Sequence, residues 1–221
     1  ILLWIAGGMS PQDVRDRLLS KDTDFQKELF AYMESAHQGE FSTGTLDEVA
    51  ARIPAEKKPN DLNANYIDPT KTLPAPPPTP PCKDIKSCSE MCENCLLHLT
   101  WWDAVKRVID DLVIRSNLHT CDASRGCLDK DGICKARFPR ELIPKTVFDE
   151  KDGRILMKKL ESRINNYTPL LTYLLRCNSD VTCMMSGTTM KAVIMYVTDY
   201  ITKVNLKSHH VFSAAYDIFQ K

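Results

Sequence analysis

The sequence predicts an α+β fold that is rich in helix, with a small partial sheet and a Cys-rich insertion. Apolar residues recur at helical spacing in several segments, and two short apolar runs, 1–8 and 170–178, have the character of buried strands. Seven of the nine cysteines lie between Cys82 and Cys134. The chain of 221 residues is long enough for one medium domain or two small ones.

The bulk composition disfavours two classes of protein. Lysine plus arginine and aspartate plus glutamate number 29 each, so the chain is not a globally basic nucleic-acid binder. A local basic patch is still compatible with this balance. No apolar run approaches the roughly 18 residues that span a bilayer, so no membrane partner is expected.

The first segment, residues 1–52, is expected to hold a strand and helices. The opening ILLWIAGG is β-prone and lacks the basic start of a signal peptide; because it begins with isoleucine, we expect a fragment of a longer polypeptide. The SPQD stretch at Ser10 marks a helix start, and a weaker helix is expected over 46–52. Between them, helical spacing predicts a helix over 24–36 with a core-facing stripe of Phe25, Leu29, Tyr32 and Met33.

Residues 53–81 are expected to form a proline-rich linker. Nine of the thirteen prolines fall between Pro54 and Pro81, and the segment ends in PAPPPTPP. Proline fixes φ and lacks a backbone donor, so the composition predicts an extended, poorly packed connector of polyproline character. The alternative is that the segment is a ligand for a proline-recognition domain.

Residues 82–140 form a Cys-rich segment with two clusters of metal-ligand residues. We call Cys82, Cys88, Cys92 and Cys95 the first cluster, and His119, Cys121, Cys127 and Cys134 the second cluster. Zinc takes four thiolate or imidazole ligands in a tetrahedron. Because the second cluster would leave no open position on the ion, it predicts a structural zinc site rather than a catalytic one.

Other states of the cysteines stay open from the residues alone. The thiols could be free, or one zinc site could draw ligands from both clusters. The odd number of cysteines and the lack of a secretory signal disfavour a disulfide framework. Cys177 and Cys183 are expected to be small buried side chains. The remaining histidines show no partner at ligand spacing: His37, His98, His209 and His210.

Further helices and a strand are expected in and after the Cys-rich segment. A helix over 101–115 is predicted by a stripe of Trp101, Val105, Val108, Ile109 and Leu112. In the last segment, 141–221, we expect a strand over 170–178 and helices over 190–203 and 208–219. Tyr196 and Tyr200 lie beside the apolar stripe of the 190–203 helix, where ordinary amphipathic packing is the simpler explanation from spacing alone.

Three blocks of the sequence, in order, resemble the replication-initiator region of Helitron transposons, in forms associated with fungal genomes. They are SNLHTCDASRGCLDKDGICKARFPRE (116–141), LLRCNSDV (174–181) and KAVIMYVTDYITK (191–203). The opening ILLWIAGGMSPQDVRDRLL also resembles the stretch that follows the family's histidine–hydrophobic–histidine motif. The resemblance covers most of the chain, apart from the proline linker and the first cluster.

The resemblance implies a nuclear, rolling-circle nuclease that nicks and transfers single-stranded DNA, upstream of a helicase domain. In that family, paired histidines hold a divalent metal that polarises the scissile phosphate, and a tyrosine attacks to form a phosphotyrosine link. By resemblance, Tyr196 and Tyr200 are the nucleophile pair and lie close to the opening strand. Lys203 continues the same helix edge and is a candidate phosphate contact.

The chain departs from the family pattern in ways that bear on activity. It contains no paired-histidine motif, and Asp199 stands where the family often has lysine. No GxxxxGK phosphate loop is present, so no helicase activity is expected in these residues. We therefore expect the chain to be inactive by itself. The alternative function is a non-catalytic, zinc-stabilised module that binds DNA or a protein.

Basic residues near the second cluster are further candidates for DNA contacts. The candidates are Lys135, Arg137 and Arg140, with Lys158, Lys159 and Arg163 expected on a following helix. Solvated surface charge is the alternative for all of them.

Overall fold

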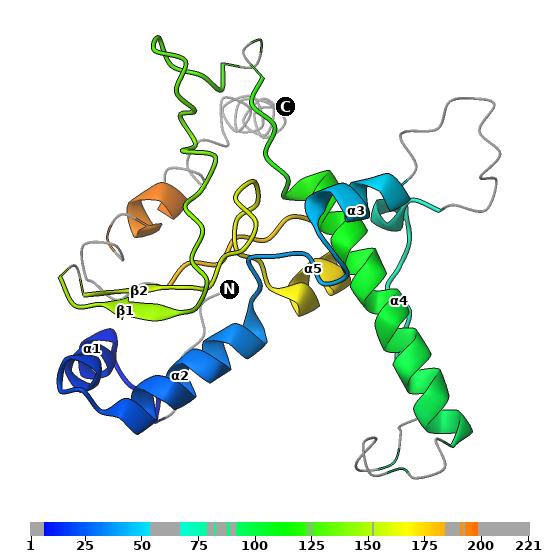
Figure 1. Cartoon of the computed structure of the whole chain (residues 1–221), viewed down its shortest axis with the longest axis horizontal. Coiled ribbons are helices and arrows are strands. Elements are labelled where there is room, and N and C mark those ends of the chain that lie inside the picture. Colours follow the sequence, from blue (N-terminus) through cyan, green and yellow to red (C-terminus); the bar gives the residue numbers. More distant parts are fainter. Residues whose placement is uncertain are drawn as a thin grey trace, which may run out of the picture. The chain divides into compact units, whose positions relative to one another are not determined.

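The computed structural model describes residues 7–53, 67–78, 82, 88, 92–122, 124, 126–151, 153–183, 191 and 193–198 (Figure 1). Contacts divide the chain into two compact units: residues 1–26, 148–155 and 183–221 form the first, and residues 27–147 and 156–182 form the second. Helices predominate and the sheet is small, so the predicted α+β class is confirmed. In the described part of the chain, no helix combines the length and apolar character needed to cross a bilayer.

The first described helix, α1 (Pro11–Leu19), begins as the sequence predicts. The Asp13 backbone N–H donates to Ser10 Oγ at 3.1 Å, and the Ser10 N–H donates to Asp13 Oδ2 at 3.1 Å. This reciprocal capping box satisfies two backbone donors at the helix N-terminus, and Pro11 needs none. The helix start is therefore a local property of the SPQD stretch.

The sheet is a short hairpin rather than the pairing expected from the sequence. Strand β1 (Val147–Asp149) pairs with β2 (Arg154–Leu156). At the turn, Gly153 has φ of +63°, and its N–H donates to the Asp149 carbonyl at 2.7 Å. A side chain at Gly153 would also meet the Arg15 guanidinium, so glycine suits this position on two grounds.

The second expected strand, residues 170–178, is wrong. Residues Pro169–Leu175 form helix α5, and Arg176 ends it in the left-handed conformation with φ of +54°. A short apolar run has no period that separates a buried strand from a helix, and Pro169 fits the first helical turn. The first expected strand falls mostly on residues 1–6, outside the described residues.

Helix α4 (Glu93–Ser116) is the centre of the second unit. It contacts α3 (Leu46–Arg52), α5 and the 3₁₀ turn η1 (Pro69–Lys71) (Figure 1). The helices predicted over 101–115 and 46–52 are thus confirmed, and α4 begins earlier than expected. The buried apolar cluster around it consists of Phe41, Val49, Val105, Ile109, Val113, Ile164, Tyr167 and Tyr173.

Helix α2 (Thr23–Ala36) confirms the helix predicted over 24–36 but not all of its core face. Met33 is buried, whereas Tyr32 is 69% exposed. Only part of the predicted stripe is therefore covered in the folded chain.

The described part of the proline segment makes contacts that a solvated connector would not make. Pro69 is buried in η1. The Trp101 Nε1–H donates to the Ala75 carbonyl at 3.3 Å, and the Tyr173 hydroxyl donates to the same oxygen at 2.9 Å. Pro69 and Ala75 thus contact α4 and α5, while most of residues 67–78 are exposed, as the composition predicts.

The helix expected around Lys158 and Lys159 is also absent from the described residues. Lys159 instead forms an antiparallel bridge with Ile143, with reciprocal backbone bonds of 2.7 and 2.8 Å. The bridge continues the extended chain that leaves β2. Residues 154–163 therefore belong to the hairpin arm and the loop that follows it.

Candidate metal centres

The second cluster brings its four predicted ligands together. His119 Nε2 lies 3.3 Å from each of the sulfurs of Cys121, Cys127 and Cys134. The Cys127 and Cys134 sulfurs are 3.7 Å apart, and all four ligand atoms lie within 4.8 Å of one another. The imidazole therefore faces a triangle of thiols.

These distances match the edges of a zinc tetrahedron. With Zn–S bonds of about 2.3 Å and Zn–N bonds of about 2.0 Å, the sulfur–sulfur edge is about 3.8 Å and the nitrogen–sulfur edge about 3.5 Å. The observed 3.7 and 3.3 Å fall within a few tenths of an ångström of those edges. A disulfide would place two sulfurs about 2.05 Å apart, and none of the nine cysteines is paired in this way.

A small hairpin carries two of the ligands of the second cluster. Leu128 and Cys134 form an antiparallel bridge, and the Lys135 N–H donates to the Cys127 carbonyl at 2.9 Å. The DKDG turn closes the hairpin: Asp129 Oδ1 accepts from the Ile133 N–H at 2.8 Å. The turn signature of Asp129 and Gly132 is visible in the sequence and predicts this hairpin by itself.

The protein backbone favours a thiolate at Cys134. The N–H of Phe138 is the largest influence, and with the N–H of Ala136 and the neighbouring thiols it outweighs burial and lowers the pKa of Cys134 to about 6. The pKa of Cys121 rises to about 11, mainly through its side-chain contact with Cys134. The Cys134 thiolate thus accepts hydrogen bonds from neighbouring thiols, which keep their protons. A bound metal ion would replace those protons.

His119 is held in place by an aromatic stack that the sequence did not reveal. Its ring stacks on Phe138 with centroids 4.3 Å apart and an interplanar angle of 12°. The Arg140 guanidinium carbon lies over the same Phe138 ring, 4.6 Å from its centroid. The His119 backbone N–H donates to the Arg163 carbonyl at 2.8 Å. Such outer contacts orient a ligating imidazole.

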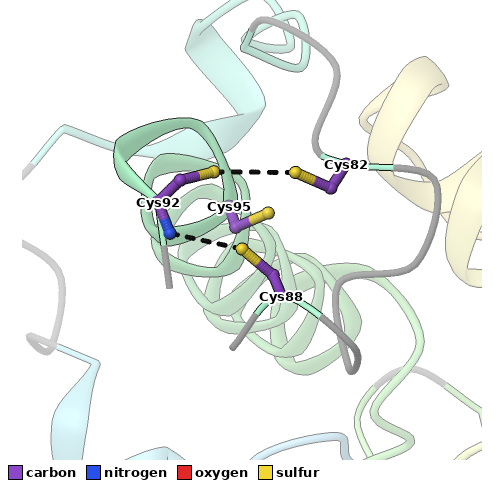
Figure 2. Close-up of side chains that lie close together, drawn as sticks. All are labelled: Cys82, Cys88, Cys92 and Cys95. Carbon is purple, nitrogen blue, oxygen red and sulfur yellow. Dashed lines mark hydrogen bonds between the residues drawn. The ribbon is translucent and has the colours of Figure 1, made fainter. Parts of the chain in front are cut away.

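The first cluster also gathers its four cysteines (Figure 2). Cys92 precedes the first residue of α4 and Cys95 lies in its first turn, so one helix end supplies two ligands. The sulfurs of Cys82 and Cys92 are 3.8 Å apart, again the edge of a zinc tetrahedron. The Cys92 N–H donates to the Cys88 sulfur at 3.4 Å.

The helix end stabilises negative charge at the first cluster. The backbone N–H of Cys95, close to the Cys92 sulfur, is the largest of the influences that lower the pKa of Cys92 to about 7. Side-chain contacts with Cys92 and its neighbours raise the pKa of Cys82 to about 12. Each cluster is therefore complete by itself, and no ligand shared between the two clusters is needed.

No protein-family model, no curated protein and no solved structure matches this chain.

The tyrosine pair is only partly described. Tyr196 lies in helical residues 193–198 and is 69% exposed. Tyr200, Asp199 and Lys203 lie outside the described residues, as does the expected helix over 208–219. The closeness of the tyrosines to the opening strand therefore stays a prediction. Among the apolar stripe residues, Ile194 and Val197 are exposed at 59% and 45%.

The candidate DNA-binding cations differ in how far they are engaged by the protein. Lys135 and Arg137 are exposed beside the second cluster, although Lys135 Nζ also donates to the Gly126 carbonyl at 3.0 Å. Arg140 is half-buried and donates to Asn165 Oδ1 at 3.1 Å, so its visible role is structural. Lys135 and Arg137 are thus the better candidates of the three.

Lys158 and Lys159 are engaged within the fold rather than offered to solvent. Lys158 pairs with Glu40 at 2.7 Å. Lys159 donates to the Ile164 carbonyl at 3.0 Å, and burial lowers the pKa of Lys159 to about 8. We no longer count either as a phosphate contact.

The expectation that Cys177 and Cys183 are buried needs correction, whereas His98 lies outside the metal-ligand clusters as expected. Cys177 is exposed rather than buried, and Cys183 is half-buried. His98 packs near Trp101 with ring centroids 5.6 Å apart, and its Nδ1 is buried without a hydrogen-bond partner among the described residues. Neither Cys177 nor His98 belongs to a metal-ligand cluster in the described part of the chain.

Proposed function

We propose that this chain is a zinc-stabilised part of a Helitron-type protein that nicks and transfers single-stranded DNA. One observation carries the proposal: the first of the three blocks that resemble this family, 116–141, brings four ligands together at zinc spacing. The Cys and His spacing of this block predicts a zinc site, and the four ligand atoms lie at the distances that such a site requires. The resemblance supplies the activity, and the ligand geometry supports the zinc-stabilised part of the proposal.

Both zinc ions would be structural in this proposal. Four protein ligands leave no position for water or substrate, so an ion there neither activates a nucleophile nor polarises a phosphate. The chemistry would instead fall to Tyr196 and Tyr200. Since tyrosine has an ordinary pKa of about 10, the pair would need a divalent metal held by histidines that this sequence does not contain.

DNA binding is tested with the zinc-loaded chain and a single-stranded oligonucleotide. We expect binding that weakens steeply with salt, because phosphate contacts release counterions. A double variant, Lys135→Gln with Arg137→Asn, should lower the salt slope by about 1.4 if both cations contact phosphate. Asparagine is chosen because Arg137 has φ of +62°, which asparagine tolerates.

The matched control removes two exposed lysines elsewhere, Lys27→Gln with Lys71→Gln. It should leave the salt slope unchanged. Equal effects of the two double variants would show that the second cluster has no special part in DNA binding. A salt-independent interaction would count against a phosphate-binding role for the whole chain.

Nicking is tested in a polypeptide that joins a paired-histidine segment to this chain, with magnesium or manganese. We expect a covalent protein–DNA adduct that is lost when Tyr196→Phe and Tyr200→Phe are combined, because phenylalanine keeps the ring and removes the nucleophile. The control is Tyr32→Phe, an exposed tyrosine on α2. An adduct that survives the double variant contradicts the assignment of the nucleophiles.

A non-catalytic module that binds a protein is the second candidate. It is favoured by the exposed leucines of α5, since Leu170 and Leu175 are each 64% exposed. Zinc binding with neither single-stranded DNA binding nor adduct formation would select this candidate over the first.

A further inference from the structure

The described proline segment lies on an aromatic surface formed by α4 and α5. Figure 1 shows it in teal, alongside α4. The Ala75 carbonyl accepts two hydrogen bonds, from Trp101 Nε1 at 3.3 Å and from the Tyr173 hydroxyl at 2.9 Å. The two aromatic rings meet edge to face, with centroids 6.5 Å apart. Tyr173 is only 7% exposed, so the surrounding core fixes the position of its hydroxyl, which donates to the Ala75 carbonyl.

The sequence of the segment makes it a preorganised ligand. Proline at positions 74 and 76–78 restricts φ, and each residue before a proline is pushed toward extended conformations. Such a strand has no internal hydrogen bonds, so its carbonyls are free to accept from a receptor. Aromatic grooves whose N–H and O–H groups donate to these carbonyls are the usual receptors for proline-rich peptides.

The aromatic surface continues into an apolar groove beside the proline segment. This groove has a volume of about 830 Å³, and its lining includes Pro74–Pro77, Trp101, Trp102, Tyr173, Leu170 and Leu174. Trp102, Leu170 and Leu174 are 45%, 64% and 48% exposed, so open apolar surface lies along the walls. The charged residues of the lining are Glu34 and Lys106, one of each sign. The groove therefore suits an uncharged, apolar strand.

We propose that the aromatic surface of Trp101 and Tyr173 binds proline-rich peptides, and that the chain's own residues 74–78 are its resident ligand and form one wall of the adjoining groove. The resident segment identifies the ligand chemistry, because it shows which donors and rings this surface offers to a proline-rich backbone. The proposal is independent of DNA binding and of nicking. It also differs from the alternative drawn from the sequence, in which the proline segment was a ligand for some other domain.

A tethered ligand competes with a free one. The resident segment belongs to the same chain, and tethered ligands act at effective concentrations in the millimolar range. A free peptide should therefore bind the unaltered chain weakly. It should bind more tightly, by at least about tenfold, when the binding of the resident segment is weakened.

The test uses the full zinc-loaded chain and the synthetic peptide PAPPPTPP, followed by calorimetry and by tryptophan fluorescence. In one variant, which we call the vacated variant, Pro74→Gly, Pro76→Gly and Pro77→Gly weaken the binding of the resident segment. We expect it to bind the peptide at least about tenfold more tightly than the unaltered chain. Adding Tyr173→Phe should weaken that binding about fivefold, because one hydroxyl donor is lost, whereas adding Tyr32→Phe should not.

The control peptide replaces every proline with serine, giving SASSSTSS. If the vacated variant keeps its zinc and its cooperative melting yet binds both peptides equally, the proposal is overturned. A second measurement guards against a variant that does not fold. At millimolar PAPPPTPP, the unaltered chain should show a tryptophan fluorescence change that the serine peptide does not cause, and its absence would also overturn the proposal.

Discussion

Replacing Cys134 with serine should remove one zinc ion and unfold the segment around the second cluster. Cys134 is the buried member of that cluster, 5% exposed, and its sulfur lies 3.3 Å from His119 Nε2. Serine cannot supply a thiolate ligand at neutral pH. Structural zinc contributes on the order of 10 kcal/mol in small zinc peptides, a large share of the stability of a typical domain.

The effect should be large because little else holds this segment. Apart from Cys134, the described residues of 121–137 include none that is buried. The hairpin that carries Cys127 and Cys134 depends on a bridge, a turn and the ligands themselves. Metal binding compensates the conformational entropy that this loop-rich stretch loses when it becomes ordered. Without the ion, that compensation would be lost.

Metal analysis and thermal melting measure the outcome for Cys134→Ser. Purified without chelator, the wild-type chain should carry two zinc ions and the variant about one, with a clearly lower melting temperature. Cys177→Ser is the matched control, since Cys177 is exposed and lies outside both clusters. Two zinc ions in the Cys134 variant, or fewer than about half an ion per wild-type chain, would contradict the zinc assignment.

Replacing Asp110 with alanine should destabilise the second unit by about 3–5 kcal/mol. Asp110 is 1% exposed on α4 and accepts from the Ser42 N–H at 2.7 Å, from the Thr43 N–H at 2.8 Å and from the Thr43 hydroxyl. These bonds hold the loop after Phe41 against the helix. Alanine would leave two part-buried backbone donors without their acceptor, each at a cost of about 1–3 kcal/mol.

Asparagine at position 110 should destabilise the second unit less than alanine does. Comparing it with wild type at several pH values should show how the protonation of Asp110 affects stability. Burial is the largest influence and raises the pKa of Asp110, so the folded chain binds this proton more readily than the unfolded chain. The contribution of such a group is full below its unfolded pKa and is lost as pH rises through the folded one. Between pH 7 and about 4, falling pH should therefore favour wild type over Asp110→Asn.

Chemical denaturation at several pH values measures these differences. Asp103→Ala is the control on the same helix, because Asp103 is exposed and, within the described part of the chain, makes a surface pair with Lys106 at 3.2 Å. That variant should change the unfolding free energy by less than about 0.5 kcal/mol. If Asp110→Ala is as mild as the control, the carboxylate is not what holds the loop.

Features set by near neighbours in the chain were predicted well. The helix start at Ser10, the helix over 46–52 and the apolar stripe of α4 all depend on residues within a few turns of each other. The two ligand sets were also predictable, because zinc chemistry restricts the ligand types and the short loops bring the ligands together. The DKDG turn was a further local signal for the second cluster.

Features that depend on distant partners were missed or predicted wrongly. Residues 170–178 were expected to be a strand because an apolar run of this length fits either structure, and α5 forms where α4 offers a face to pack against. Tyr32 continues the helical stripe of α2 but is 69% exposed, whereas Met33 is buried.

The sequence by itself determined the start of α1, the ligand types of the two clusters and the absence of net charge. Only the tertiary structure decided which strands pair, that Asp110 holds a loop 68 residues away, and that the proline segment lies on Trp101 and Tyr173. The physical reason is the range of the interactions. Caps, turns and short-loop metal ligands are satisfied by nearby atoms, whereas buried polar groups and apolar faces take whichever distant partner completes the core.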